Sequence, residues 1–245
     1  MIDTQPEGSA AATGKSPSPT LDKNSKSHNG WPRTAIGAAV VAAAALCIAS
    51  AWIVHQATTK HQMTRALSGR VHLVVVHVTA GDIHLVNGGG PAELRSTARY
   101  IFSKPRVTTS VASGVLSVRS KCGNWWLHDC STNIHLSVPP GAAVDADTDH
   151  GQITSEGLVS GQVRADASGK VRLRLANDPN LIVARSRHGD VSIRLPRAPY
   201  IVDATAAFDQ KHIGIPHNDA APRTIEATAR HGEVKIQATP NKEQP

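Results

Sequence analysis

One short pattern recurs through the second half of the chain and limits the folds that the chain can adopt. Each copy runs through alternating apolar and polar residues to a glycine and then into a second alternating segment. The clearest copies begin at Val144, Ile182 and Ile225, and weaker copies begin at Val163 and Ile201. A period of two predicts β-strands, and a repeat of about 20 residues predicts that each copy is one unit of a stack.

A glycine marks the turn of each copy, except in the weakest copy, where Gln210 takes its place. Successive turn positions lie 18 to 22 residues apart. We expect these glycines to adopt a positive φ, which residues with a Cβ avoid. They are Gly151, Gly169, Gly189 and Gly232. The predicted fold class is all-β, a solenoid-like stack of short strands over residues 71–239 that is closed, open or folded back as a sandwich.

An uncharged stretch of twenty residues, from Ala35 to Val54, predicts one membrane-spanning helix. Twenty helical residues rise about 30 Å, the thickness of the hydrocarbon layer. Trp31 and Trp52 lie at the ends of the stretch, as interfacial aromatic residues do. The alternatives are a signal peptide cleaved near Ser50 and a buried helix. The long polar segment before the stretch and its apolar character on every side favour a spanning helix.

The predicted helix, residues 34–54, divides the chain into regions of different character. Residues 1–33 are polar and rich in Pro, Gly and Ser, which predicts a disordered cytoplasmic tail. Residues 55–70 are expected to form a stalk, 71–239 an extracytoplasmic β-repeat domain, and 240–245 a short tail. The basic residues around the helix favour this orientation slightly. We therefore expect a single-pass protein of the cell membrane.

Cys122 and Cys130 are the two cysteines outside the predicted helix. A pair that flanks a short loop in an exported domain predicts a disulfide, and the alternative is two free thiols in a reducing compartment. The loop contains Trp125 and Trp126. Rigid exposed aromatic residues are candidate anchors for a protein or a sugar, and the alternative is that they cap the end of the stack.

Seven arginines fall on three successive repeats, where stacking would align several of them into a ladder. They are Arg164, Arg172, Arg174, Arg185, Arg187, Arg194 and Arg197. Such a ladder could grip phosphate or carboxylate groups, and the alternative is a solvated face balanced by aspartates. The net charge is +7 for the chain, but residues 70–240 carry 19 basic and 15 acidic residues, or +4. This modest excess favours an anionic envelope polymer, a lipid or a protein as partner over nucleic acid.

Thirteen histidines raise the question of a metal site, and three of them, His150, His188 and His231, occupy the same repeat position. If each repeat is one rung, they lie on rungs one, three and five. Their separation would then be about 9.6 Å, too far to share an ion. We therefore expect neither a metal nor a cofactor, and predict that these histidines are solvent-facing turn residues.

Enzyme motifs are missing from the sequence. It contains no GxSxG, HExxH, GxxxxGK or GxGxxG pattern. Asp145, Asp147 and Asp149 alternate along one predicted strand and would share one face, where they could bind a cation weakly. Nothing selects a pair of carboxylates for hydrolysis. We therefore predict that the chain is not an enzyme.

The repeats, together with the segment Leu136–Gly141 that leads into them, resemble the bacterial DUF4097 family of adhesin-type β-repeat domains over about residues 71–239. The resemblance implies a membrane-anchored envelope protein with a role in surface interaction, and it implies no mechanism. The His-Gly turns and the loop between the cysteines depart from the family pattern. We expect an interaction module that binds a wall polymer, lipid or protein. The alternatives are an envelope-stress sensor and an envelope glycan hydrolase.

Overall fold

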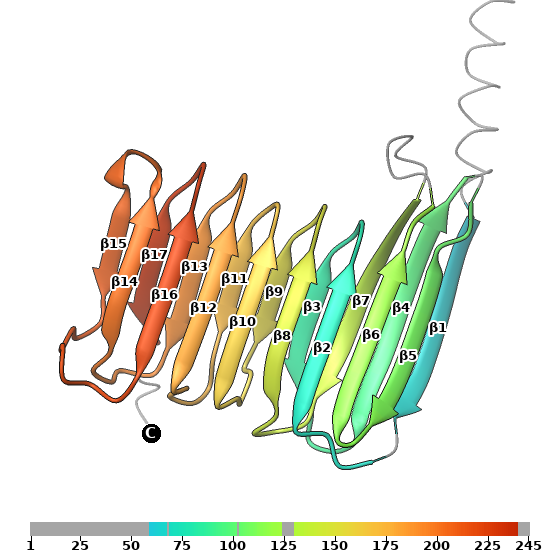
Figure 1. Ribbon diagram of the computed structural model, residues 1–245, viewed down its shortest axis with the longest axis horizontal. Coiled ribbons are helices and arrows are strands. Elements are labelled where there is room, and N and C mark those ends of the chain that lie inside the picture. The colour runs from blue at the N-terminus through green and yellow to red at the C-terminus, as the bar shows by residue number, and fades with distance from the viewer. Residues whose placement is uncertain (1–58, 68, 102, 124–129, 240–245) are drawn as a thin grey trace, which may run out of the picture. The chain divides into compact units, whose positions relative to one another are not determined.

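The computed structural model describes residues 59–67, 69–101, 103–123 and 130–239. Within these residues the chain is all-β, as predicted, apart from a 3₁₀ turn at Ala207–Asp209. The strands form two sheets (Figure 1). The predicted spanning helix, residues 34–54, lies outside the described residues. Within the described ranges, no helix has the length and apolar character needed to cross a membrane.

Within the described ranges the two sheets contain nine and eight strands. In spatial order the nine-stranded sheet consists of β1 (Thr59–Leu67), β4 (Ala92–Tyr100), β7 (Cys130–Val138), β3 (Ile83–Asn87), β9 (Ile153–Glu156), β11 (Val171–Arg174), β13 (Val191–Leu195), β17 (Val234–Ala238) and β15 (Lys211–Gly214). The eight-stranded sheet consists of β14 (Ile201–Ala206), β16 (Thr224–Ala229), β12 (Leu181–Ser186), β10 (Gln162–Ala167), β8 (Ala143–Thr148), β2 (Leu73–Val78), β6 (Val115–Lys121) and β5 (Arg106–Ala112).

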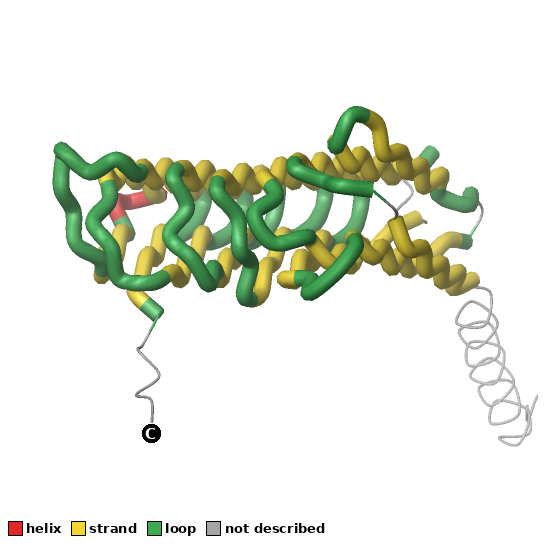
Figure 2. Tube along the Cα trace, turned by 90° about the horizontal axis from the view of Figure 1, so that it is seen from below, coloured by secondary structure: helices red, strands yellow, loops and turns green. Residues whose placement is uncertain are grey.

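Consecutive strands alternate between the sheets from β6 to β17, and β2 and β3 do the same. Each such pair of strands forms one coil of the chain, and each coil pairs in parallel with its neighbours. Figure 2 shows the sheets as two layers of strands joined by turns. At the amino-terminal end the pairing is antiparallel, between β1 and β4, β4 and β7, and β5 and β6.

The core lies between the two layers and is built from small aliphatic side chains. In β8 every second residue is buried, and the buried Val144 is in register with Val163, which in turn pairs with Ile182. Because residues alternate across a strand, one side chain in two points into this layer and the next points to solvent. The polar residues of the repeats therefore form the outer faces of the sheets.

The sheet begins earlier than the stalk prediction for residues 55–70 implied. β1 occupies Thr59–Leu67 and pairs with β4 along its whole length. Its end is buried at Leu67, so this segment covers part of the core rather than extending away from it.

The order of the coils in space differs from their order in the sequence. The last coil, β16 and β17, lies between β12–β13 and β14–β15, so the prediction that successive repeats occupy successive rungs is wrong there. The rings of His188 and His231 consequently stack on adjacent coils, with centroids 5.4 Å apart and planes inclined by 6°. The sequence repeats alone cannot predict this insertion, because every repeat offers similar strand edges to a neighbouring coil.

The prediction of positive φ for the four turn glycines is also wrong, since none of them is among the residues with positive φ. Their role is close packing between coils. A Cβ at Gly169 would lie 2.7 Å from the carbonyl oxygen of Gly151, and one at Gly232 would meet that of Gly189. The glycines form a column in which only a hydrogen atom fits between successive turns. In the outermost coil the 3₁₀ turn before Gln210 replaces the glycine turn.

Candidate functional site

The seven arginines of the repeats divide between the two outer faces instead of forming one ladder. Arg164 and Arg185 lie on β10 and β12 of the eight-stranded sheet, and Arg187 directly follows β12. Arg172 and Arg174 lie on β11 of the nine-stranded sheet. Arg194 lies on β13, and Arg197 follows that strand. The division arises because consecutive strands belong to opposite sheets, so arginines in adjacent half-repeats face opposite directions.

Four cations gather on the outer face of the nine-stranded sheet, and we call them the cationic patch: Arg172, Arg174, Arg194 and Lys235. Arg174 is directly in register with Arg194 on the neighbouring strand. Arg172 and Lys235 lie on either side of Ser192, with which both are in register. Strands are spaced about 4.8 Å apart, so the four side chains leave the sheet within an area about 10 Å wide.

The four side chains of the patch all carry a positive charge and stand without ion-pair partners among the described residues. The three arginines are exposed and Lys235 is half-buried. Like charges directly opposite on neighbouring strands destabilise a sheet. The arrangement therefore has an electrostatic cost that a bound anion would offset.

Basic and polar side chains continue along the same row of the sheet. Thr154 is in register with Arg172 and with His84, which in turn is in register with His135. The two imidazole rings lie 5.0 Å apart, and Nδ1 of His84 is 2.7 Å from the Thr154 hydroxyl. Burial, followed by the charges of His84 and Arg95, lowers the pKa of His135. The row thus carries cations at several strands and a pair of neighbouring imidazole rings.

A cavity of about 450 Å³ lies at the amino-terminal part of this row. Glu93, Arg95 and His135 contribute to its lining, and Arg95 Nε donates to Glu93 Oε1 at 2.8 Å. Arg95 is therefore already paired, in contrast to the cations of the patch.

The eight-stranded sheet has a different character, because acidic and basic side chains are mixed on its outer face. On this sheet Nη2 of Arg185 lies 3.6 Å from Oε2 of Glu226. Asp166 lies between Asp147 and Arg185 in the register of neighbouring strands. Burial, followed by the charge of Asp147, raises the pKa of Asp166, although nearby arginines oppose the shift.

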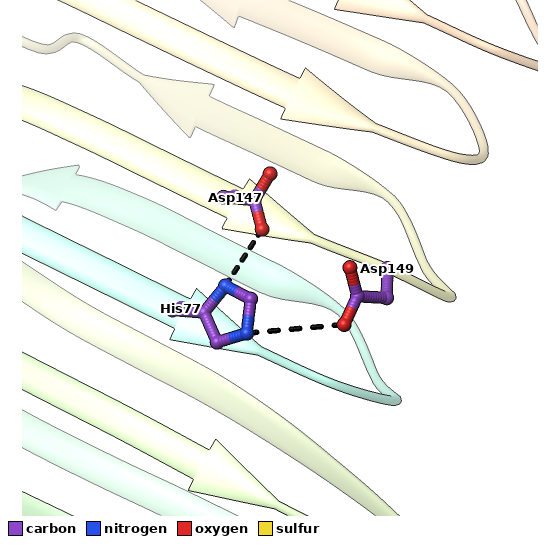
Figure 3. Close-up of side chains that lie close together, drawn as sticks. All are labelled: His77, Asp147 and Asp149. Carbon is purple, nitrogen blue, oxygen red and sulfur yellow. Dashed lines mark hydrogen bonds and ion pairs between the residues drawn. The ribbon is translucent and has the colours of Figure 1, made fainter.

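A cluster of three side chains on this face was not predicted from the sequence. His77 on β2 lies beside Asp147 on β8, and Asp149 directly follows β8 (Figure 3). The distance from Nδ1 of His77 to Oδ1 of Asp147 is 2.7 Å, and that from Nε2 to Oδ2 of Asp149 is 3.8 Å. The expectation that Asp145, Asp147 and Asp149 share a face is confirmed, since all three are half-buried and alternate with buried residues of the same segment. The histidine partner of Asp147 is 70 residues away, and no local pattern indicates it.

The predicted disulfide is present. Cys122 and Cys130 are bonded, with their Cα atoms 5.8 Å apart. Trp125 and Trp126, the candidate anchors in the loop between them, lie outside the described residues. Their part in binding stays a prediction.

Comparisons with known proteins identify the fold. No protein-family model and no curated protein matches the sequence. Among solved structures, a putative cell adhesion protein from Clostridium sporogenes is similar with a TM-score of 0.52 and 10% identity, over 74% of this chain and 100% of that one. A putative adhesin from Bacteroides fragilis has a TM-score of 0.34 and 13% identity, over 74% and 98%.

The likeness to the Clostridium sporogenes protein shows a shared adhesin-like β fold. Two proteins with 10% sequence identity can share a fold without binding the same partners. Membership of the DUF4097 family stays a prediction.

Proposed function

We propose that this chain is a membrane-anchored, non-enzymatic interaction module of the bacterial cell envelope, and that its β domain binds an anionic polymer through the cationic patch. The observation that carries the proposal is the set of four cations on β11, β13 and β17, for which the described part of the chain provides no ion-paired carboxylate. The shared fold with a putative cell adhesion protein supports the same role.

The chemistry of the patch suits phosphate or carboxylate groups. A guanidinium group presents a planar set of donors that matches either anion bidentately, and three of the four cations are arginines. A polymer brings several anions to neighbouring strands at once, and each contact after the first is intramolecular. Exposed single contacts are weak in water, so a repeating ligand suits this flat face better than a small anion does.

Binding to immobilised polyphosphate tests this proposal with the full chain. We expect the double substitution Arg172→Glu and Arg194→Glu to weaken binding at least tenfold. The matched control, Arg164→Glu with Arg185→Glu, makes the same change of charge on the other sheet and should alter binding less than threefold. Affinity should fall as salt rises, because the charges are exposed. Equal losses in both double variants would show a response to net charge alone and overturn the assignment.

The membrane anchor is proposed from the apolar stretch Ala35–Val54. A tag placed after residue 239 makes the topology measurable on intact cells. We expect external protease to remove the tag while the amino-terminal segment stays protected until the cells are lysed. A tag that resists protease until lysis would contradict the proposed orientation.

A further inference from the structure

We propose that His77, Asp147 and Asp149 form a binding site for a divalent transition-metal ion of the zinc class on the outer face of the eight-stranded sheet. The site lies on the sheet opposite the cationic patch, so it does not depend on the function proposed for that patch. The donor atoms that these three residues offer all lie within 4.8 Å of one another.

Parallel pairing of two strands creates the cluster. His77 and Asp147 are in register on β2 and β8, and both point away from the core. Asp149 follows at the end of β8, where its backbone N–H donates to the carbonyl oxygen of Val78 at 3.1 Å. This bond ties the backbone of Asp149 to the strand that carries His77. The sheet therefore fixes the positions of His77 and Asp147, and the start of the turn after β8 fixes that of Asp149.

The distances separate two roles. Nδ1 of His77 lies 2.7 Å from Oδ1 of Asp147, a hydrogen-bond distance at which the imidazole donates its Nδ1–H to the carboxylate. This tautomer leaves a lone pair on Nε2. Metal-binding histidines commonly use the second nitrogen in this way, with a carboxylate that holds the ring in place. Asp147 is then the positioning residue, and Nε2 is the ligand atom.

The other side of the ring faces Asp149. Nε2 and Oδ2 of Asp149 are 3.8 Å apart, which is too long for a hydrogen bond. Zinc binds imidazole nitrogen and carboxylate oxygen at about 2.0 to 2.2 Å, so one ion can reach both atoms from a position between them. The three side chains are 38%, 38% and 42% exposed, which leaves room for water to complete the coordination.

The local charge also suits a cation. With a neutral His77 ring, the cluster carries two carboxylates, and Asp166 adds a third at the register position next to Asp147. Arg119 occupies the position on the other side of His77 and bounds the site there. An imidazole nitrogen among the donors favours zinc and its neighbours over Ca²⁺ and Mg²⁺, which prefer oxygen ligands alone.

Isothermal titration of the metal-free full chain with Zn²⁺ tests the assignment. Because the chain has 13 histidines, the informative quantity is the difference between variants. We expect His77→Gln and Asp149→Asn each to lose one equivalent of bound zinc relative to the unsubstituted chain. Asp147→Asn should keep that equivalent with an affinity lowered about 10- to 100-fold, as loss of a positioning carboxylate does.

Two control variants make the result specific to the cluster. His84→Gln removes a histidine of the opposite sheet, and Asp145→Asn removes a carboxylate two residues from Asp147 on the same strand. Both should bind zinc as the unsubstituted chain does. Circular dichroism should show the same β content in every variant, because all the changed side chains lie on outer faces. If His77→Gln and the unsubstituted chain bind the same number of ions with the same affinity, the proposal fails.

Discussion

The hydroxyl group of Ser186 donates a hydrogen bond to the carbonyl oxygen of Gly169 on the neighbouring coil, at a distance of 2.8 Å. Thr148 makes the equivalent bond to Gly81 at 2.9 Å. Both hydroxyls are buried and lie three residues before a turn glycine. In both coils, therefore, the hydroxyl residue of the repeat donates a hydrogen bond to a carbonyl group in the turn of the adjacent coil. This position is a Ser or Thr in these two coils because it makes a contact between coils.

Replacing Ser186 by alanine should lower the free energy of unfolding by about 1 kcal/mol, because the Gly169 carbonyl loses its hydroxyl donor. Urea denaturation followed by circular dichroism measures this. Ser117→Ala is the matched control, since Ser117 is half-buried on the outer face of β6. Equal losses of stability in the two variants would contradict a specific role for the Ser186 hydroxyl.

Gly151→Ala should lower the free energy of unfolding by about 3 kcal/mol, because the added methyl group overpacks the turn and forces the backbone to move. The new Cβ would meet the Gly81 carbonyl oxygen and lie 2.6 Å from its carbon, both of them backbone atoms of the next coil. The control is Gly161→Ala, where no atom lies within 4 Å of the added Cβ. Thermal unfolding should separate the two clearly. A Gly151→Ala protein as stable as the Gly161→Ala protein would show that the column of glycines is not close-packed.

Tyr200→Phe should leave stability unchanged or raise it by up to about 1 kcal/mol, because a buried hydroxyl without a partner carries a desolvation cost. The ring is fully buried, and within the described residues its hydroxyl has no hydrogen-bond partner. Burial, followed by the charge of Asp178, raises the pKa of Tyr200 to about 12. Ultraviolet titration of a Tyr100→Phe variant reports Tyr200 alone. A midpoint near the ordinary value of 10.0 would contradict this environment.

Asp166→Asn should stabilise the protein near neutral pH and weaken its response to acid. Burial and Asp147 raise the pKa of Asp166 above 3.8, so the folded state binds this proton more tightly than the unfolded state does. Stability linked to this group therefore rises as the pH falls through the raised pKa and levels off below 3.8. Melting temperatures measured from about pH 7 to about pH 4 check the sign. A larger rise in acid for Asp166→Asn than for the unsubstituted chain would refute it.

The all-β class and the disulfide could be predicted because both depend on local signals. Alternation along Val144–Thr148 specifies which side chains face the core, and the spacing of Cys122 and Cys130 allows closure of a short loop. The order of the coils could not be predicted in the same way. The strands that contain Ile182 and Ile225 offer similar surfaces to any neighbour. The local sequence therefore does not indicate that these two strands, β12 and β16, pair directly.

The grouping of side chains on the two outer faces could not be predicted from the sequence either. Arg164 and Arg172 are close in sequence, yet the turn between β10 and β11 sends them to opposite sheets. The partners that define each face come from other coils. Arg174 meets Arg194 and His77 meets Asp147 through strand register, which becomes known only when the pairing of strands is known.

The position of β2 bears on how the domain responds to mechanical load. Among the described strands β1 is an edge strand that pairs with β4, whereas β2 is hydrogen-bonded to β6 on one side and to β8 on the other. Tension applied at Thr59 can peel β1 one bond at a time, but it then meets a strand clamped along both edges. Extracting that strand requires two ladders of hydrogen bonds to break, one with β6 and one with β8. A pull from the amino-terminal end would thus be arrested after one strand, and the coils that carry the cationic patch would keep their shape.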